Sequence, residues 1–114
     1  MWRLSMALTQ SERTPTASMA RAARRALEIR ASLPPSKRGG TEVGLARARD
    51  IANRRPLSED TIMRMASFFA RHAESPGSAK ARQDQTSKAA QAWGLWGGAP
   101  GRSWAARLKR KIKQ

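Results

Sequence analysis

Three of the four tryptophans of this chain lie within twelve residues, between Trp93 and Trp104. The same block holds four glycines, and elsewhere the chain has one more tryptophan, two phenylalanines and no tyrosine. Large aromatic side chains supply much of the apolar surface that a small core can bury. A core formed by this chain must therefore include the block, or the indoles are left free to contact a partner.

The length of 114 residues allows one small domain with tails. The chain has no cysteine, which excludes disulfides and cysteine-based zinc sites, and its single histidine, His72, excludes a histidine-cluster metal site. No apolar run approaches the ~18 residues of a membrane-spanning helix. We therefore expect no metal, no cofactor and no membrane contact.

The net charge of +15 is concentrated at the two ends. Residues 1–40 carry eight basic and two acidic side chains, residues 41–79 six and five, and residues 80–114 nine and one. A nearly neutral middle between two basic ends attracts polyanions such as DNA or RNA to the ends. The alternative is a surface that is merely soluble, although solubility needs far less charge.

Helical periodicity and capping residues predict an all-α fold: a small helical domain of about four to five short helices with basic, partly extended ends. We expect the first helix to start at Thr14-Pro15 and to end near Leu33. The next two are expected over about 42–53, capped by Thr41, and after Ser58. A fourth is expected over about 87–96, and a last one is capped by Ser103 after a turn at Pro100-Gly101. Residues 36–40 and 74–86 are expected to be a flexible link and a mobile loop.

In terms of domains, the sequence indicates four parts. These are a flexible arm over 1–15, a basic helix over 16–35, a helical core domain over 41–106 and a basic tail over 107–114. Trp93, Trp96 and Trp104 are expected to close the core with Ile62 and Phe69. The alternative is that the indoles stack on exposed bases.

Catalysis has little support in the sequence. His72 is the only available base and is expected at a helix end. The acidic candidates for a metal-dependent site are few, and Glu59 and Asp60 are better explained by the dipole of the helix that they begin. No phosphate-cradling glycine motif is present. We expect a protein that is not an enzyme.

Two groups of cations are candidates for phosphate contacts. The first helix carries Arg21, Arg24 and Arg25 within about one turn. The tail carries Arg107, Lys109, Arg110, Lys111 and Lys113. Contacts of this kind give affinity for nucleic acid without choice of sequence.

Four segments together resemble a small uncharacterised domain of tailed-phage proteins. They are RGGTEVGLARARD at 38–50, LSEDT at 57–61, FFARH at 68–72 and AWGLWGG at 92–98, with Gly101 and Trp104-Ala105 following. The resemblance covers about residues 20–106 and departs at 73–86, where the segment is short and lacks the acidic, lysine-containing pattern. It implies a phage origin, with a location in the virion or the host cytoplasm, and it supplies no catalytic residue that can be carried over to this sequence.

The leading hypothesis is a non-enzymatic phage accessory protein that binds nucleic acid, with DNA expected, through its basic ends. The alternative is a virion structural protein that docks on capsid, portal or neck subunits through its N-terminal arm and first helix. An inhibitor that mimics DNA would be acidic, so the charge argues against that class. The sequence leaves the oligomeric state open.

Overall fold

The computed structural model describes residues 7–112. Within this range the chain forms six α-helices and no strand, which confirms the predicted all-α fold. The helices are α2 (Ala17–Ser32), α3 (Glu42–Ala52), α4 (Glu59–Glu74), α5 (Pro76–Ala81), α6 (Lys88–Leu95) and α7 (Gly98–Ile112), with a short 3-10 helix η1 (Pro35–Lys37).

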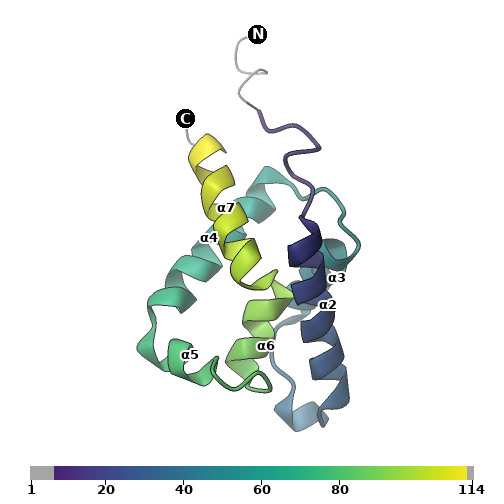
Figure 1. Cartoon of the computed structure of the whole chain (residues 1–114), viewed down its shortest axis with the longest axis vertical. Helices are drawn as coiled ribbons and strands as arrows, with labels where there is room; N and C mark the ends of the chain where they lie inside the picture. The colour runs from purple at the N-terminus through teal and green to yellow at the C-terminus, as the bar shows by residue number, and fades with distance from the viewer. Residues whose placement is uncertain (1–6, 113–114) are drawn as a thin grey trace.

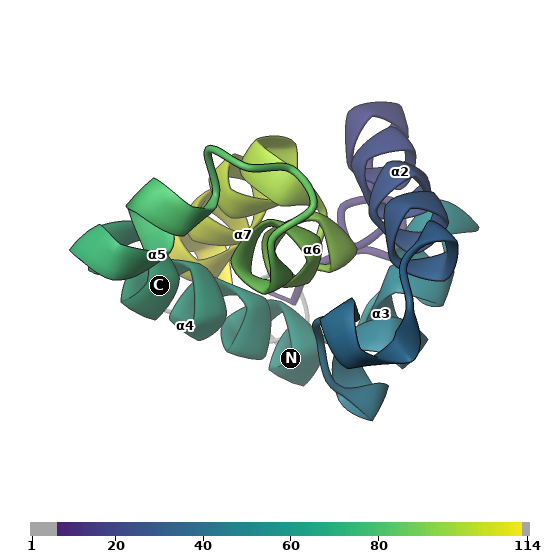
Figure 2. The ribbon, with the colours of Figure 1, turned by 90° about the horizontal axis from the view of Figure 1, so that it is seen from below.

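The helices are arranged as two pairs with α6 between them (Figures 1 and 2). α2 packs against α3, and α4 packs against α7. α6 contacts members of both pairs and lies closest to α2. The short α5 projects at the far end of α4 (Figure 1). This arrangement gives a chain with little bulky apolar material a single shared core.

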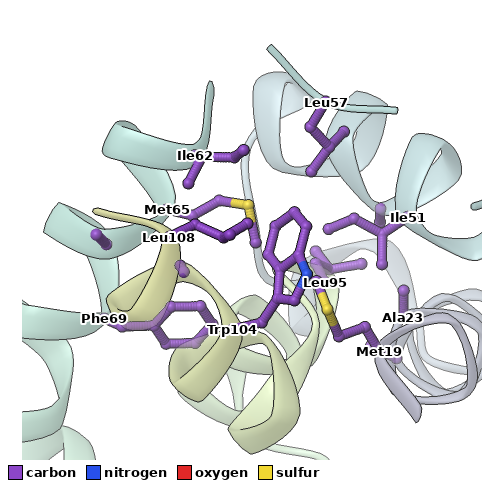
Figure 3. Close-up of a cluster of buried hydrophobic side chains, with 14 of the residues drawn as sticks. Met19, Ala23, Ile51, Leu57, Ile62, Met65, Phe69, Leu95, Trp104 and Leu108 are labelled. Atoms are coloured by element: carbon purple, nitrogen blue, oxygen red, sulfur yellow. The ribbon is translucent and has the colours of Figure 1, made fainter. Parts of the chain in front are cut away.

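The core contains one indole at its centre. Trp104 is 3% exposed and lies between Met65 and Leu108 on one side and Met19 and Ile51 on the other (Figure 3). Ile62 and Phe69 are buried in the same cluster. The buried face of α2 is largely alanine, and that of α3 includes Gly44 and Ala48, so these helices approach closely while Trp104 fills the remaining space.

Local capping determines where several helices begin. Thr41 accepts a hydrogen bond from Gly44 N–H, and Ser58 accepts one from Thr61 N–H, so both predicted caps are confirmed. The predicted start of the first helix is wrong by two residues, because the cap is Thr16. The Thr16 hydroxyl accepts from Met19 N–H, and the residue before it, Pro15, is buried.

The predicted mobile loop over 74–86 contains the helix α5. Ser75 caps it and Pro76 takes the first helical position, where its missing N–H has no cost. The predicted flexible link over 36–40 is also wrong, because the segment is tied to α6. The buried Gln91 accepts from Gly39 N–H at 2.7 Å and donates to the carbonyl oxygen atoms of Lys37 and Thr86.

The predicted turn at Pro100-Gly101 is instead the first turn of α7. Gly97, with φ +104°, makes the sharp reversal after α6, as expected from the Gly97-Gly98 pair. Pro100 is tolerated there because the first turn of a helix leaves its N–H groups without helical partners. Gly101 is required, because a Cβ at this position would lie 2.6 Å from the carbonyl oxygen of Trp96.

Residues 7–15, expected within a flexible arm, contact the domain. Leu8 is buried, and its N–H donates to a carboxylate oxygen of Glu59 at 3.1 Å. The Arg13 guanidinium donates to the carbonyl oxygen of Leu57 at 2.9 Å. Trp2 lies outside the described residues. The segment thus covers the start of α4.

Candidate nucleic-acid interface

The basic end of the chain is part of a packed helix. α7 continues through residues 107–112, expected as a tail, because Leu108 is buried and Ile112 packs against the core. Lys113 lies outside the described residues. The cationic side chains occupy the outer face: Arg107, Arg110 and Lys111 are exposed and Lys109 is half-buried. Because this helix is already packed on the core, its cations can bind a ligand without the entropic cost of ordering a flexible tail.

A groove of about 360 Å³ between α4 and α7 collects three cations. Arg102, Lys109 and Arg110 line its α7 wall, and Ala66 and Ala70 line the α4 wall with one carboxylate, that of Glu74. A helix rises 1.5 Å per residue, so positions 102 and 110 are about 12 Å apart along the axis. That distance is the axial length of roughly three to four base pairs.

Most of these charges are not neutralised. In the part of the chain that the structure describes, ion pairs join Arg47 and Arg55 to Asp50, Arg64 to Asp60, and Lys111 to Glu12. No such pair involves Arg107, Lys109 or Arg110 within residues 7–112. The end of α7 therefore keeps an excess of positive charge.

Besides Glu74, the carboxylate of Glu12 approaches this surface. Its hydrogen bond from Lys111, together with one from the backbone N–H of Thr9, lowers the pKa of Glu12 from 4.5 to about 2. Both side chains remain partly exposed, so solvent screens the pair. The pair links residues 7–15 to the last turn of α7. In this pair Lys111, one of the predicted phosphate-binding cations, already has a carboxylate partner.

The three arginines predicted on the first helix are exposed but point to different neighbours. Arg21 donates to the Ser18 hydroxyl on its own helix. Arg24 donates to the carbonyl oxygen of Ala52, the last residue of α3, and Arg25 donates to the Gln85 amide oxygen. Two of the three therefore join α2 to adjacent segments. The structure does not bring them together as one patch.

The tryptophans of the C-terminal block have different environments. Trp104 is buried, whereas Trp93 and Trp96 are half-buried and pack at the edge of the core. Trp93 meets Phe69 edge to face at 4.9 Å and is covered by the Arg82 guanidinium, 3.8 Å above its ring. Trp96 instead lines a second groove.

This second groove, here called the aromatic groove, has a volume of about 420 Å³ and lies between α4, α6 and the start of α3. Its aromatic side chains form a row: Phe68 stacks on Trp96, with ring centroids 5.6 Å apart, and lies 4.3 Å from His72. Arg64 and Arg71 line it from the same helix as Phe68. Val43 lines the α3 wall and is 53% exposed.

Sequence reasoning missed the aromatic groove. In the sequence, Phe68 stands out only as part of the FFARH segment, and His72 only as the single available base, expected at a helix end. A signal was present, because positions 64, 68, 71 and 72 share one helix face, beside the buried face formed by Ile62, Met65 and Phe69. Only the fold shows that this second face meets Trp96.

The arrangement offers binding surfaces more than catalytic groups. Among residues 7–112, no three histidine, cysteine or carboxylate side chains gather in a way that could hold a metal ion. The ring of His72 lies against Phe68, and its backbone carbonyl accepts from Arg82 at 2.9 Å. Glu59, one of the sequence's acidic candidates, accepts from Leu8 N–H.

Comparisons with protein-family models, curated proteins and solved structures find no match to this chain. The resemblance to a tailed-phage domain stays a prediction from the sequence motifs. None of the helices within residues 7–112 is long and apolar enough to cross a membrane.

Proposed function

We propose that this protein is a non-enzymatic accessory protein that binds nucleic acid, with DNA as the expected partner, by gripping phosphates with the basic end of α7. The observation that carries the proposal is the packing of residues 107–112. Their apolar side is held on the core, and among residues 7–112 Lys111 is the one cation of this segment that forms an ion pair. The sequence resemblance to a phage domain supports a role during infection.

The proposed contacts are electrostatic. Arg107, Lys109 and Arg110 would bind phosphate oxygens, and Arg102 extends the same surface along α7. Binding of this kind releases counterions, so the affinity falls steeply as salt rises. It carries no sequence information, which suits a protein that acts along DNA rather than at one site. Arg21, Arg24 and Arg25 are exposed and would add contacts to a longer strand.

The test compares two variants that lose the same amount of charge. The first combines R107Q, K109Q and R110Q, and the control combines R49Q, K80Q and K88Q, which are exposed and lie on α3, α5 and α6. Affinity for a fluorescent DNA duplex is measured by anisotropy over a range of salt concentrations. The α7 variant should lose about 0.9 in the slope of log affinity against log salt for each phosphate contact removed.

Two results would contradict the proposal. One is that the unmodified protein does not bind the duplex at low salt. The other is that the control variant loses as much affinity as the α7 variant, which would mean that the net charge acts without a defined site. Circular dichroism of all three proteins checks that the helices are retained.

The alternative function, a virion structural protein that docks through its N-terminal arm and first helix, has less support. Leu8 and Pro15 are already buried in this chain, and the apolar side of α2 is part of the core. Docking through these elements would need contacts from their remaining exposed faces. Mass spectrometry of washed particles, with copy number, would distinguish the two functions.

A further inference from the structure

The aromatic groove is lined by aromatic and apolar side chains together with two arginines. α4 contributes Arg64, Phe68, Arg71 and His72, which fall on one helix face. α6 contributes Ala92 and Leu95, Trp96 follows directly as its C-cap, and the first turn of α3 closes the opposite wall. The groove is therefore built by three helices that are fixed to a common core.

Phe68 and Trp96 form a stack that another flat ring can extend on an outer face. Phe68 and Trp96 are nearly parallel, with an angle of 28° between their planes. His72 continues the row on the next turn of α4. Rings held in this way keep their faces in place without help from a ligand, so little ordering is needed on binding.

The groove also has an unpaired apolar wall and a positive charge. Among the described residues, Val43 is the one large hydrophobic side chain that is exposed. No carboxylate is among the residues that line the groove, and Arg71 forms no ion pair within residues 7–112. Arg64 is held by Asp60 through its Nε atom, at 3.2 Å. A ligand that complements these features has a flat apolar part and a negative charge.

We infer that the aromatic groove binds an unpaired nucleobase of a single strand, with the adjacent phosphates on Arg71 and Arg64. The inference rests on the proposed nucleic-acid binding and narrows it to strands with unpaired bases. The groove volume of about 420 Å³ is large enough for a small ligand. A paired base in a duplex does not expose its face, so a duplex would use the end of α7 and leave the aromatic groove empty.

The experiment measures binding of two probes, a labelled oligothymidylate and a labelled duplex, to variants of the whole chain. R71Q and V43E change exposed positions of the groove, and R49Q and V43Q are their matched controls. F68L keeps apolar bulk but removes the ring. Loss of one stacked base corresponds to about a 5- to 150-fold weaker affinity.

We expect F68L and V43E to weaken oligothymidylate binding while duplex binding stays unchanged. R71Q should lower the salt slope for the single strand by about 0.7. The indole N–H resonance of Trp96, assigned with W96F, should shift when oligothymidylate is added. The indole N–H resonance of the buried Trp104 should not.

The outcomes separate this inference from the function on which it rests. If the α7 variant weakens both probes and the groove variants weaken neither, the inference is overturned and the proposed function stands. If neither probe binds the unmodified protein, both fail. If the groove variants lose binding to an acidic, tryptophan-containing peptide and not to oligothymidylate, the groove serves a protein partner, and the inference is likewise overturned.

Discussion

Gly94 of α6 lies so close to Ala26 of α2 that a Cβ atom at position 94 would stand 2.7 Å from the Ala26 Cβ atom. The two helices can approach in this way only because α6 has no side chain there. We expect G94A to lower the free energy of unfolding by about 1–2 kcal/mol, since the added methyl group overpacks the contact. Urea denaturation followed by circular dichroism measures the change.

Gly44 provides the matched control, because it also lies inside a helix. A Cβ atom at position 44 would meet Thr41 Oγ1 at 3.5 Å and Trp96 Nε1 at 3.6 Å, which are ordinary contacts. G44A should therefore raise the free energy of unfolding by up to about 1 kcal/mol, through the better helix propensity of alanine. Equal effects of the two substitutions would show that α2 and α6 are not packed as described.

The buried side-chain amide of Gln91 should also contribute strongly to the stability of the fold. Q91M keeps much of the volume but leaves Gly39 N–H and the carbonyl oxygen atoms of Lys37 and Thr86 without their partner. Because a buried unpaired polar group costs about 1–3 kcal/mol, we expect a loss of at least about 2 kcal/mol in the free energy of unfolding. Q83M, at an exposed position, should change it by less than about 0.5 kcal/mol.

The tryptophans should differ in their contributions to stability. W104A removes the indole at the centre of the core and should cost about 3–5 kcal/mol. W96A removes a half-buried ring at the edge of the aromatic groove and should cost clearly less. Thermal unfolding of both variants measures the difference. A larger loss for W96A than for W104A would contradict the assignment of Trp104 as the centre of the core.

Features determined by neighbouring residues could be predicted from the sequence. Thr41 and Ser58 are predictable as helix caps because a hydroxyl before a helix can accept from an N–H three residues later, and the structure shows both bonds. The turn predicted at Pro100 and Gly101 was wrong, although both residue types favour turns locally. They lie instead in the first turn of α7, and Gly101 allows the close approach to the carbonyl oxygen of Trp96. α5 was missed because its sequence is polar, although Ser75 and Pro76 are typical of a helix start.

The candidate sites were harder to predict than the fold. The cations of α7 were found because charge is visible in the sequence. Their attachment to the core depends on Leu108 and Ile112, which meet distant partners. The aromatic groove needs Val43, Phe68 and Trp96 from three helices, and no local spacing relates them.

The pKa of Glu12 gives a prediction for acid pH. In the folded protein the pKa is about 2, below the ordinary value of 4.5, because Lys111 and Thr9 bond to the carboxylate. The stabilisation from this group is therefore fully present above about pH 4.5 and is lost as the pH falls toward 2. The carboxyl carbon shift of Glu12, followed by NMR, should titrate near the lower value. A midpoint near 4.5 would show that the pair with Lys111 does not form in solution.

The same pair makes a prediction for DNA binding. Glu12 neutralises Lys111 beside the proposed phosphate-binding surface, so E12Q should free this cation and strengthen duplex binding at neutral pH. The gain should appear as a salt slope that is steeper by up to about 0.9, the value for one more phosphate contact. E42Q changes the same charge at an exposed position on α3 and serves as the control. If E12Q and E42Q strengthen binding equally, the gain comes from net charge, and Lys111 does not contact the phosphates.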